Sequence, residues 1–197
     1  ALPISHLFIQ GYYAGANAME PAVFIEGEAS AAANDVDYVT VSLMDATTYS
    51  LVESVTAPLQ TDGSLVTTFT SPDLSGNSYY LKITSRNMLE TWSANPVLLS
   101  ATTTYDFTDD NLKAYQDPFN SNPQTVEVEP GVWAMYNGDV NQDGTIDALD
   151  FNDMEIDVNN FEFGYFATDI TGAGPVDALD FNLLEINSSY FLFVAHP

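Results

Sequence analysis

Short apolar runs, rich in β-branched and aromatic side chains, recur through the first half of the chain. They fall at residues 7–9, 39–43, 51–52, 65–69, 79–83 and 104–107. Clusters of Gly, Asn, Asp, Pro and Ser separate them, as at 61–63 and 71–76, and no helical period intervenes. About seven strands at this spacing predict an antiparallel β-sandwich over residues 1–107, of immunoglobulin-like or prealbumin-like class.

The pattern loosens after residue 107. Residues 108–137 contain only two further β-type runs, at 125–128 and 132–133. Trp133, Met135 and Tyr136 are bulky and costly to expose to water. We therefore expect 108–137 to be a connecting segment that packs between two domains.

Residues 138–197 carry a helical period instead. Apolar residues three or four positions apart are Phe151, Met154 and Val158 in one stretch, and Leu179, Leu183 and Ile186 in another. Each stretch predicts a short helix that lays these residues on a partner. A small helical module is expected over 138–197.

A twelve-residue stretch, 139–150, leads into the first of these helices. Oxygen-bearing side chains stand at its positions 1, 3, 5, 9 and 12. Gly144 at the sixth position allows a sharp turn, and Ile146 at the eighth is suited to pairing with a partner loop. An EF-hand loop surrounds calcium in this register, supplying six to eight oxygens at about 2.3–2.6 Å. The predicted ligands are Asp139, Asn141, Asp143, the carbonyl of Thr145, Asp147 directly or through water, and Asp150.

A second copy follows. Residues 147–163 align without gaps on 177–193, with ten identities in seventeen positions. The second loop, 169–180, replaces the third ligand by the hydroxyl of Thr171 and loses the fifth at Ala173. Because fewer carboxylates lower calcium affinity, we expect one firm site and a second that is weaker or absent. The predicted second ligand set is Asp169, Thr171, Pro175, Asp177 and Asp180.

A calcium loop followed by one helix, present twice, resembles the dockerin repeat of cellulosomes, in which two such units pack antiparallel and bind a cohesin. With the flanking segments 133–143 and 164–169, the tail looks more like the dockerin-like C-terminal region of large secreted and surface proteins of Bacteroidota. The resemblance covers about the last third of the chain, and only loosely the immunoglobulin-like β-sandwich before it. Phe151 and Phe181 stand where cohesin-binding dockerins usually present polar residues, which weakens the cohesin interpretation.

The charge balance excludes several partners. The chain has 28 acidic residues against Lys82, Arg86 and Lys113, and a formal net charge of −25. Nucleic acid and anionic membranes are poor partners, because both attract positive charge. Residues 138–197 include twelve acidic residues and no Lys or Arg, so metal binding and folding are expected to be coupled.

Location is inferred from several weaker signs. The chain has no cysteine and no apolar run near the ~18–20 residues of a membrane span. It begins with Ala1, as a secreted product does once its signal peptide is removed, although an excised fragment would look the same. Carboxylate-rich calcium sites suit calcium-rich surroundings. We expect an extracellular or cell-surface protein.

Candidate catalytic groups are few. His6 and His196 are the only histidines, which disfavours a serine triad or a histidine-based zinc site. No acidic pair flanked by aromatic residues stands out for glycoside hydrolysis. We expect no enzyme. The aromatic residues Tyr12, Tyr13, Tyr79, Tyr80, Trp92 and Trp133 offer a sugar-stacking platform, but strand alternation places about half of them in a core.

Three functions stay open. The first is a non-catalytic, calcium-stabilised structural or adhesion protein, either a stalk domain or a unit that assembles with its own copies into a surface polymer or filament. The second is a dockerin that binds a separate cohesin, and the third is a carbohydrate-binding module. The apolar terminal segments 2–9 and 190–194 either complete their own sheets or add to a neighbour's edge.

Overall fold

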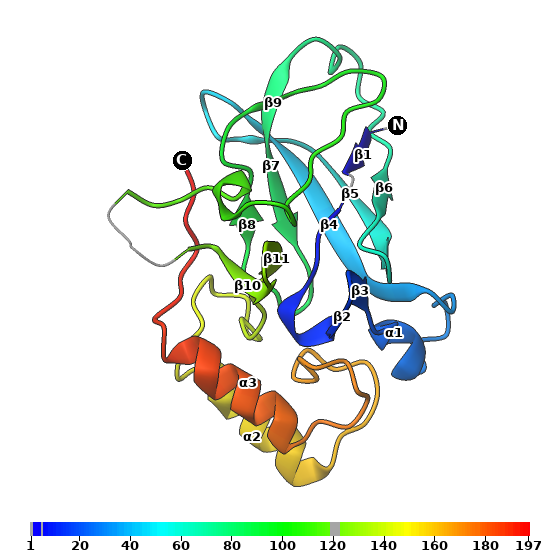
Figure 1. Cartoon of the computed structure of the whole chain (residues 1–197), viewed down its shortest axis with the longest axis vertical. Helices are drawn as coiled ribbons and strands as arrows, with labels where there is room; N and C mark the ends of the chain where they lie inside the picture. The colour runs from blue at the N-terminus through cyan, green and yellow to red at the C-terminus, as the bar shows by residue number, and fades with distance from the viewer. Residues whose placement is uncertain (1, 5, 119–122) are drawn as a thin grey trace.

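The computed structural model describes residues 2–4, 6–118 and 123–197, the first three by their backbone alone (Figure 1). Part of the predicted connecting segment, residues 119–122, and Ser5 of the N-terminal segment therefore lie outside the described residues. The strands are β1 (Leu2–Ile4), β2 (Tyr13–Gly15), β3 (Ala18–Met19), β4 (Asp35–Asp45), β5 (Leu51–Gln60), β6 (Leu65–Thr67), β7 (Ser78–Thr84), β8 (Thr91–Trp92), β9 (Val97–Leu98), β10 (Thr125–Glu129) and β11 (Val132–Met135). The helices are α1 (Ala22–Ile25), α2 (Asp150–Asn160) and α3 (Ala178–Ser188), with 3-10 turns η1 (Gln10–Tyr12) and η2 (Asn111–Lys113).

The main sheet is antiparallel, with β5, β4, β7 and β8 in that order and β9 beside the start of β7. Its centre is β4, where Val41 pairs with Val55 on one side and Ile83 on the other. Alternate residues such as Val39 and Val41 are fully buried, whereas β5 is exposed at half of its positions because it forms the edge. The predicted mainly β, antiparallel fold is confirmed.

Shorter strand pairs, β1 with β6, β2 with β3 and β10 with β11, cover the main sheet. The first hydrophobic core contains the fully buried Leu7, Ile9, Leu43 and Phe107. Strands were predicted at residues 7–9 and 104–107, but neither run forms one. They make only isolated bridges, Ile9 with Met135 and Asp106 with His6. Apolar runs mark burial at these places, and burial does not require a strand.

The structure has a second hydrophobic core, and the chain passes from the first core to the second between residues 135 and 136. Met135 is buried in the first core and Tyr136 in the second, while Trp133 is half-buried. Leu89, from the connection between β7 and β8, reaches the second core, and its N–H donates to the Tyr136 carbonyl at 2.9 Å. The other members of the second core are Val140, Ile146, Met154, Ile170, Val176, Leu184 and Leu192. The end of the predicted connecting segment 108–137 therefore contributes residues to both cores.

The two helices lie side by side at the lower end of the molecule (Figure 1). Two pairs of backbone hydrogen bonds repeat with a shift of thirty residues: Ile146 N–H donates to Leu192 O, and Val176 N–H to Glu162 O, both at 2.9 Å. Val194 N–H to Gly144 O and Gly164 N–H to Gly174 O, both at 2.8 Å, form the second pair. Each loop thus pairs with the segment after the other helix, so Ile146 does not pair with a partner loop as expected.

The predicted inward face of the second helix is wrong. Met154 of the first helix is fully buried as expected. In the second helix Leu183 packs half-buried against the second core, but Leu179 and Ile186 are 62% and 51% exposed, and Leu184 is fully buried instead. The helix has apolar residues on two sides, so the period alone did not indicate which side faces the core. None of the helices in the described part of the chain has the length and apolar composition needed to cross a bilayer.

Both terminal segments bond to their own chain. The backbone of β1 pairs with β6, with Leu2 opposite Thr67. At the other end, Phe193 forms a bridge with Thr145, and the carbonyl of Phe193 accepts from Gln124 Nε2 at 3.1 Å. The N-terminal segment therefore forms a two-stranded sheet within its own chain, whereas segment 190–194 forms no strand and makes only an isolated bridge to its own chain.

Candidate functional site

The first loop is closed by two buried carboxylates from its opposite ends. Asp139 is 2% exposed and Asp150 fully buried. Asp139 Oδ2 accepts the N–H of Gly144 at 3.2 Å. Asp150 Oδ1 accepts the N–H of Val140 at 2.7 Å, and its Oδ2 accepts that of Asp147 at 2.9 Å. The two carboxylates hold the chain in a turn around themselves.

The remaining predicted residues of this loop are more exposed. Asn141 Oδ1 accepts the N–H of Asp143 at 2.8 Å, and Asp143 Oδ1 accepts the hydroxyl of Thr145 at 2.6 Å. Asp147 Oδ1 accepts the N–H of Leu149 at 2.7 Å, so this side chain faces the start of α2. The predicted ligands lie in one loop joined by short hydrogen bonds, but the side chain of Asp147 is turned toward the helix.

The second loop has the same framework. Asp169 Oδ2 accepts the N–H of Gly174 at 2.7 Å, and Asp180 Oδ2 accepts that of Asp177 at 2.9 Å. Thr171 Oγ1 lies 2.8 Å from Asp180 Oδ1 and 3.4 Å from Asp169 Oδ1. Oxygens from the first, third and twelfth positions therefore meet, whereas Pro175 and Asp177 are exposed.

Whether these residues fit a hard divalent cation is tested by their unpaired oxygens. Asp139 Oδ1 is buried and accepts no hydrogen bond from any described residue. An orphaned buried carboxylate oxygen is costly unless a cation satisfies it. As the side chains stand, no three His, Cys, Asp or Glu groups among the described residues are gathered as a metal site. The loop's oxygen set, which also uses Asn141 and a backbone carbonyl, fits calcium by its chemistry.

Buried acidic side chains in the two loops have raised pKa values. Burial, and next the Asp150 carboxylate, raise the pKa of Asp139 to about 7. Burial raises the pKa of Asp180 to about 6, against hydrogen bonds that lower it. Both shifts mean that a negative charge at these positions lacks compensation within the chain.

A buried polar cluster joins the second loop to the β-rich part, and sequence reasoning missed it. The Arg86 guanidinium pairs with Glu26 and lies 3.3 Å from Asp37 Oδ2. It also donates to the Phe166 carbonyl at 3.0 Å and stacks on the Tyr165 ring at 4.4 Å. The one signal available was that Arg86 is the only arginine in a chain of 28 acids.

Neighbouring amides extend this cluster. Asn87 Nδ2 donates to the Ala167 carbonyl at 3.0 Å, and Asn187 Nδ2 donates to the Asn137 carbonyl at 2.7 Å. Asn137 Nδ2 in turn donates to the Ile170 carbonyl. These bonds fix residues 167 and 170 to the β7–β8 connection and to the segment after β11, and they fix α3 to that same segment.

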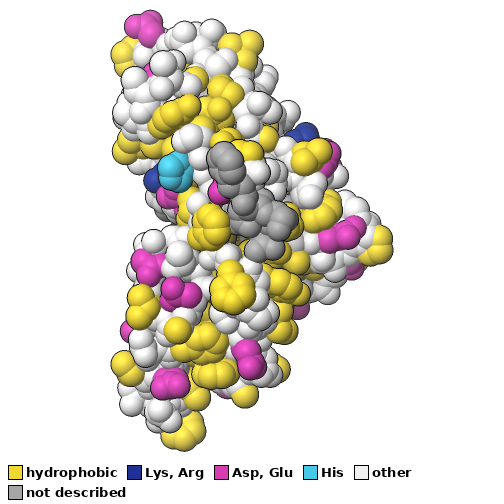
Figure 2. All heavy atoms as spheres, turned by 90° about the vertical axis from the view of Figure 1, so that its left-hand side faces the viewer, with side chains coloured by type: hydrophobic (Ala, Val, Ile, Leu, Met, Phe, Trp, Pro, Cys, Tyr) yellow, Lys and Arg dark blue, Asp and Glu magenta, His cyan; other side chains and the backbone are white. Residues whose placement is uncertain are grey.

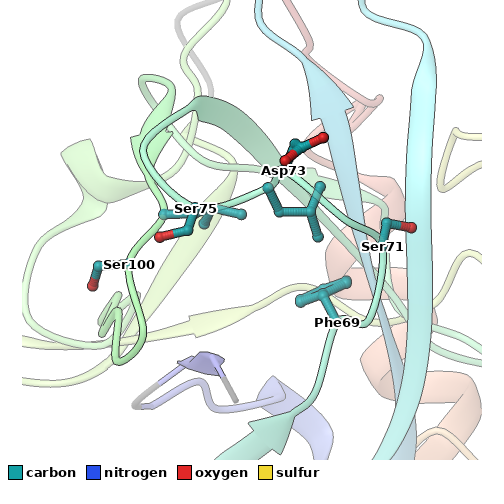
Figure 3. A pocket seen from close by; sticks show the side chains of 7 residues that line it. Phe69, Ser71, Asp73, Ser75 and Ser100 are labelled. Carbon is teal, nitrogen blue, oxygen red and sulfur yellow. The ribbon is translucent and has the colours of Figure 1, made fainter.

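Two pockets are relevant to ligand binding. One, of about 300 Å³, lies beside the first loop and is lined in part by Glu90, Asp139, Asp143 and His196. Another, of about 340 Å³, lies in the β-rich part and is lined by Phe69, Ser71, Asp73, Ser75 and Ser100, with Leu74 and Leu99 (Figure 3). The first opens on the candidate calcium ligands. The second combines one aromatic ring with hydroxyl groups.

Apolar side chains are exposed at equivalent positions of the two repeats. Phe161 and Phe191 are 89% and 81% exposed, and both have left-handed backbone conformations, with φ of 56° and 53°. The other exposed pairs are Leu149 with Leu179, Ile156 with Ile186, and Phe163 with Phe193. Figure 2 shows apolar side chains mixed with acidic ones over the lower part of the molecule, where Figure 1 places α2 and α3.

Comparisons with known proteins concern the fold. No protein-family model matches the chain, and no curated protein matches its sequence. The solved structures that match include two from crystals of a type II cohesin–X-dockerin complex of Acetivibrio cellulolyticus, one an N-terminal and one a C-terminal interface mutant. Sequence identities are 15% and 16%, and each match covers 96% of this chain and 98% of that chain with a TM-score of 0.50. At this identity the likeness is one of fold.

Proposed function

We propose that the chain is a non-catalytic, calcium-stabilised structural or adhesion protein that works outside the cell and attaches to a separate protein through α3. The observation that carries the proposal is the outward side of α3, where Leu179 and Ile186 are exposed, whereas Leu183 between them is half-buried against the second core. Leu179 and Ile186 are more than half exposed although the sequence spaces them like core residues. An apolar stripe of this kind is typical of a protein-binding surface.

Backbone strain supports the same proposal. A large residue in the left-handed region costs about 1 kcal/mol relative to glycine, and an exposed aromatic ring offsets none of that cost by burial. Phe161 and Phe191 both carry this cost, at equivalent positions of the two repeats. Two equivalent costs without gain in the isolated chain are explained by contacts made in a complex.

The kind of partner follows from charge and from the comparisons. The acidic net charge of −25 favours a partner whose contact surface is ringed by basic residues. The structures of similar fold are cohesin–X-dockerin complexes, which supports a protein partner of the cohesin type. A separate partner is favoured over exchange of terminal strands, since β1 and the segment around Phe193 bond within their own chain.

Calcium is proposed as a stabiliser. Asp139, Asn141, Asp143, Thr145, Asp147 and Asp150 would hold it in the first loop, where Asp139 has the unpaired oxygen. The ion would offset the repulsion between Asp139 and Asp150 and so fix the start of α2. Its role would be structural, because it neutralises charge and closes the turn.

Two alternatives have specific support. The edge strand β5 exposes Leu51 and Val52, which favours assembly with further copies by edge pairing. The pocket of Figure 3 combines Phe69 with three serines and Asp73, a composition that suits a sugar. The proposed aromatic platform is weaker, since Tyr12, Tyr79 and Trp92 are buried.

The test is binding to purified type II cohesin, measured by biolayer interferometry with calcium and with EDTA. We expect binding in calcium, and at least about tenfold weaker affinity for the Leu179→Ser, Ile186→Ser variant. The matched variant Leu149→Ser, Ile156→Ser changes the equivalent positions of the first repeat, just before and within α2, and Leu112→Ser changes an exposed leucine of η2.

The outcomes separate the candidates. Equal loss in both helix variants would assign binding to both repeats. Unchanged binding in both would move the contact away from the helices and contradict the proposal. If the chain binds no cohesin but forms oligomers in sedimentation, edge pairing through β5 replaces it.

A further inference from the structure

A pocket of about 340 Å³ lies between two loops of the β-rich part. The first loop, residues 69–75, follows β6, and the second, residues 99–100, follows β9 (Figure 3). Both loops are at the end of the molecule opposite α2 and α3 (Figure 1). Small-ligand pockets commonly enclose ~300–1,000 Å³, so this one has room for a small ligand.

Hydrogen bonds fix the two loops to each other. Gly76 N–H donates to the Leu99 carbonyl at 2.8 Å, and Leu99 N–H donates to the Asn77 carbonyl at 2.9 Å. Asn77 Nδ2 donates to the Asp73 carbonyl at 2.7 Å, which stabilises the left-handed conformation of Asp73, with φ of 65°. The walls of the pocket are therefore set by the fold of the chain.

One side of the pocket is apolar. Leu74 and Leu99 are 8% and 2% exposed and belong to the first hydrophobic core. The Phe69 ring is half-buried and packs against the same core, and in Figure 3 it lies across the pocket from Asp73. An aromatic ring at a pocket wall is a stacking surface for the C–H groups on one face of a sugar ring, because its electron-rich face attracts them.

Polar groups form the rim of the pocket. The hydroxyls of Ser71, Ser75 and Ser100 and the carboxylate of Asp73 belong to exposed residues. Asp73 makes no ion pair within the described part of the chain, because the three Lys and Arg residues pair with other acids. A hydroxyl both donates and accepts hydrogen bonds, and a carboxylate accepts from two donors at once. The rim therefore matches the adjacent hydroxyls of a sugar.

The charge around the pocket selects among ligands. The chain has a formal net charge of −25 and Asp73 stands at the rim, so an acidic saccharide or a phosphate is repelled. A basic peptide would pair with Asp73 but would leave the three serine hydroxyls without matching groups. A neutral sugar satisfies the carboxylate, the hydroxyls and the aromatic ring together.

We propose that this pocket binds a neutral saccharide, with a sugar ring stacked on Phe69 and two adjacent hydroxyls donating to Asp73. The site adds a ligand to the protein contact of the proposed function and does not depend on it. Because the pocket lies opposite α3, the chain connects a glycan at one end to a protein partner at the other (Figure 1). Sequence reasoning placed turn residues at 71–76 but had no means to bring them beside residues 99–100.

The experiment is a microarray of neutral, sialylated and sulfated glycans, probed with the biotinylated full chain on labelled streptavidin. Calorimetry with the neutral glycan that binds best then compares variants. Phe69→Leu keeps an apolar side chain on the core but removes the aromatic face, and Asp73→Asn removes the charge at a φ that asparagine also tolerates. We expect affinity to fall at least about fivefold in the first variant and about tenfold in the second.

Matched controls change similar residues outside the pocket. Phe24→Leu alters a ring of α1 that is 51% exposed, Asp109→Asn alters an exposed acid, and both should bind the glycan as the unmodified chain does. Thermal melts check that Phe69→Leu is folded. If its Tm falls, Asp73→Asn decides the test, because this exposed side chain is not part of the core.

The outcomes are distinct. Binding to no neutral glycan on the array overturns the inference, and so does a preference for sialylated or sulfated glycans. Glycan binding that Asp73→Asn and a folded Phe69→Leu both retain also overturns it, because the pocket is then not the site. Cohesin binding should be unchanged in both pocket variants, so failure of this inference is read separately from failure of the proposed function.

Discussion

The rings of Phe151 and Phe181 meet edge to face, with their centroids 5.0 Å apart and their planes at 62°. These residues are thirty positions apart and occupy the same place in the two repeats. Their contact therefore lies at the approximate two-fold relation between the loop–helix units. The repeated backbone bonds of Ile146 and Val176 follow the same relation.

Loss of this aromatic contact should loosen the helix pair. Phe151→Ala is expected to lower the free energy of unfolding by about 2–3 kcal/mol, because a partly buried ring and its aromatic partner are lost. Urea denaturation in calcium measures this. Phe163→Ala, at a ring that is 64% exposed, serves as control and should change stability by less than about 1 kcal/mol.

The phenylalanine at position 161 is expected to lower the stability of the fold and to contribute to binding a protein partner. Its φ of 56° is a conformation that glycine adopts without strain, so Phe161→Gly should raise the free energy of unfolding by about 1 kcal/mol. The same change should weaken binding to a protein partner, since the ring is exposed. A fall in stability would show that the ring packs on its own chain.

Arg86 should be essential for joining the two cores. Arg86→Met leaves Glu26 and Asp37 buried without their cation, and we expect a loss of about 3–5 kcal/mol in chemical denaturation. Lys113→Met removes the exposed pair with Asp109 and should cost less than about 1 kcal/mol. Similar losses in the two variants would contradict the assigned role of the buried cluster.

Calcium should bind the first loop through its buried acid. Asp139→Asn removes the charge of the carboxylate that has the unpaired oxygen, so titration should show the tight site lost. Asp109→Asn, an exposed acid outside the loops, should bind calcium as the unmodified chain does. Retained tight binding in Asp139→Asn would exclude the first loop as the site.

Without calcium, stability should fall as the pH rises. The pKa values of Asp139, Asp180 and Glu26 are raised to about 7, 6 and 8, so the folded chain holds protons that the unfolded chain has released. Thermal melts in EDTA should show Tm decreasing between about pH 5 and 8. Calcium should reverse this trend, because its ligands bind best when deprotonated. A Tm in EDTA that rises through this window would contradict the raised pKa values.

The sequence alone determined what depends on local spacing. Strand-forming runs predicted β4, β5 and β7, and the thirty-residue repeat predicted two loops followed by helices, because turn residues, β-branched residues and helical periods act within a few residues. The candidate calcium ligands were found in the same way, as their register lies within one twelve-residue loop.

Only the tertiary structure decided what depends on distant partners. It selected Leu184 over Leu179 and Ile186 as the buried side of α3, since both sides are apolar and the rest of the second core chooses between them. The fold also buries residues 7–9 without forming a strand there, and it brings Arg86, paired with Glu26, to the carbonyl of Phe166 just before the second loop. The physical reason is that burial and charge pairing are properties of the packed chain, and no local pattern specifies which distant side chain supplies the missing neighbour.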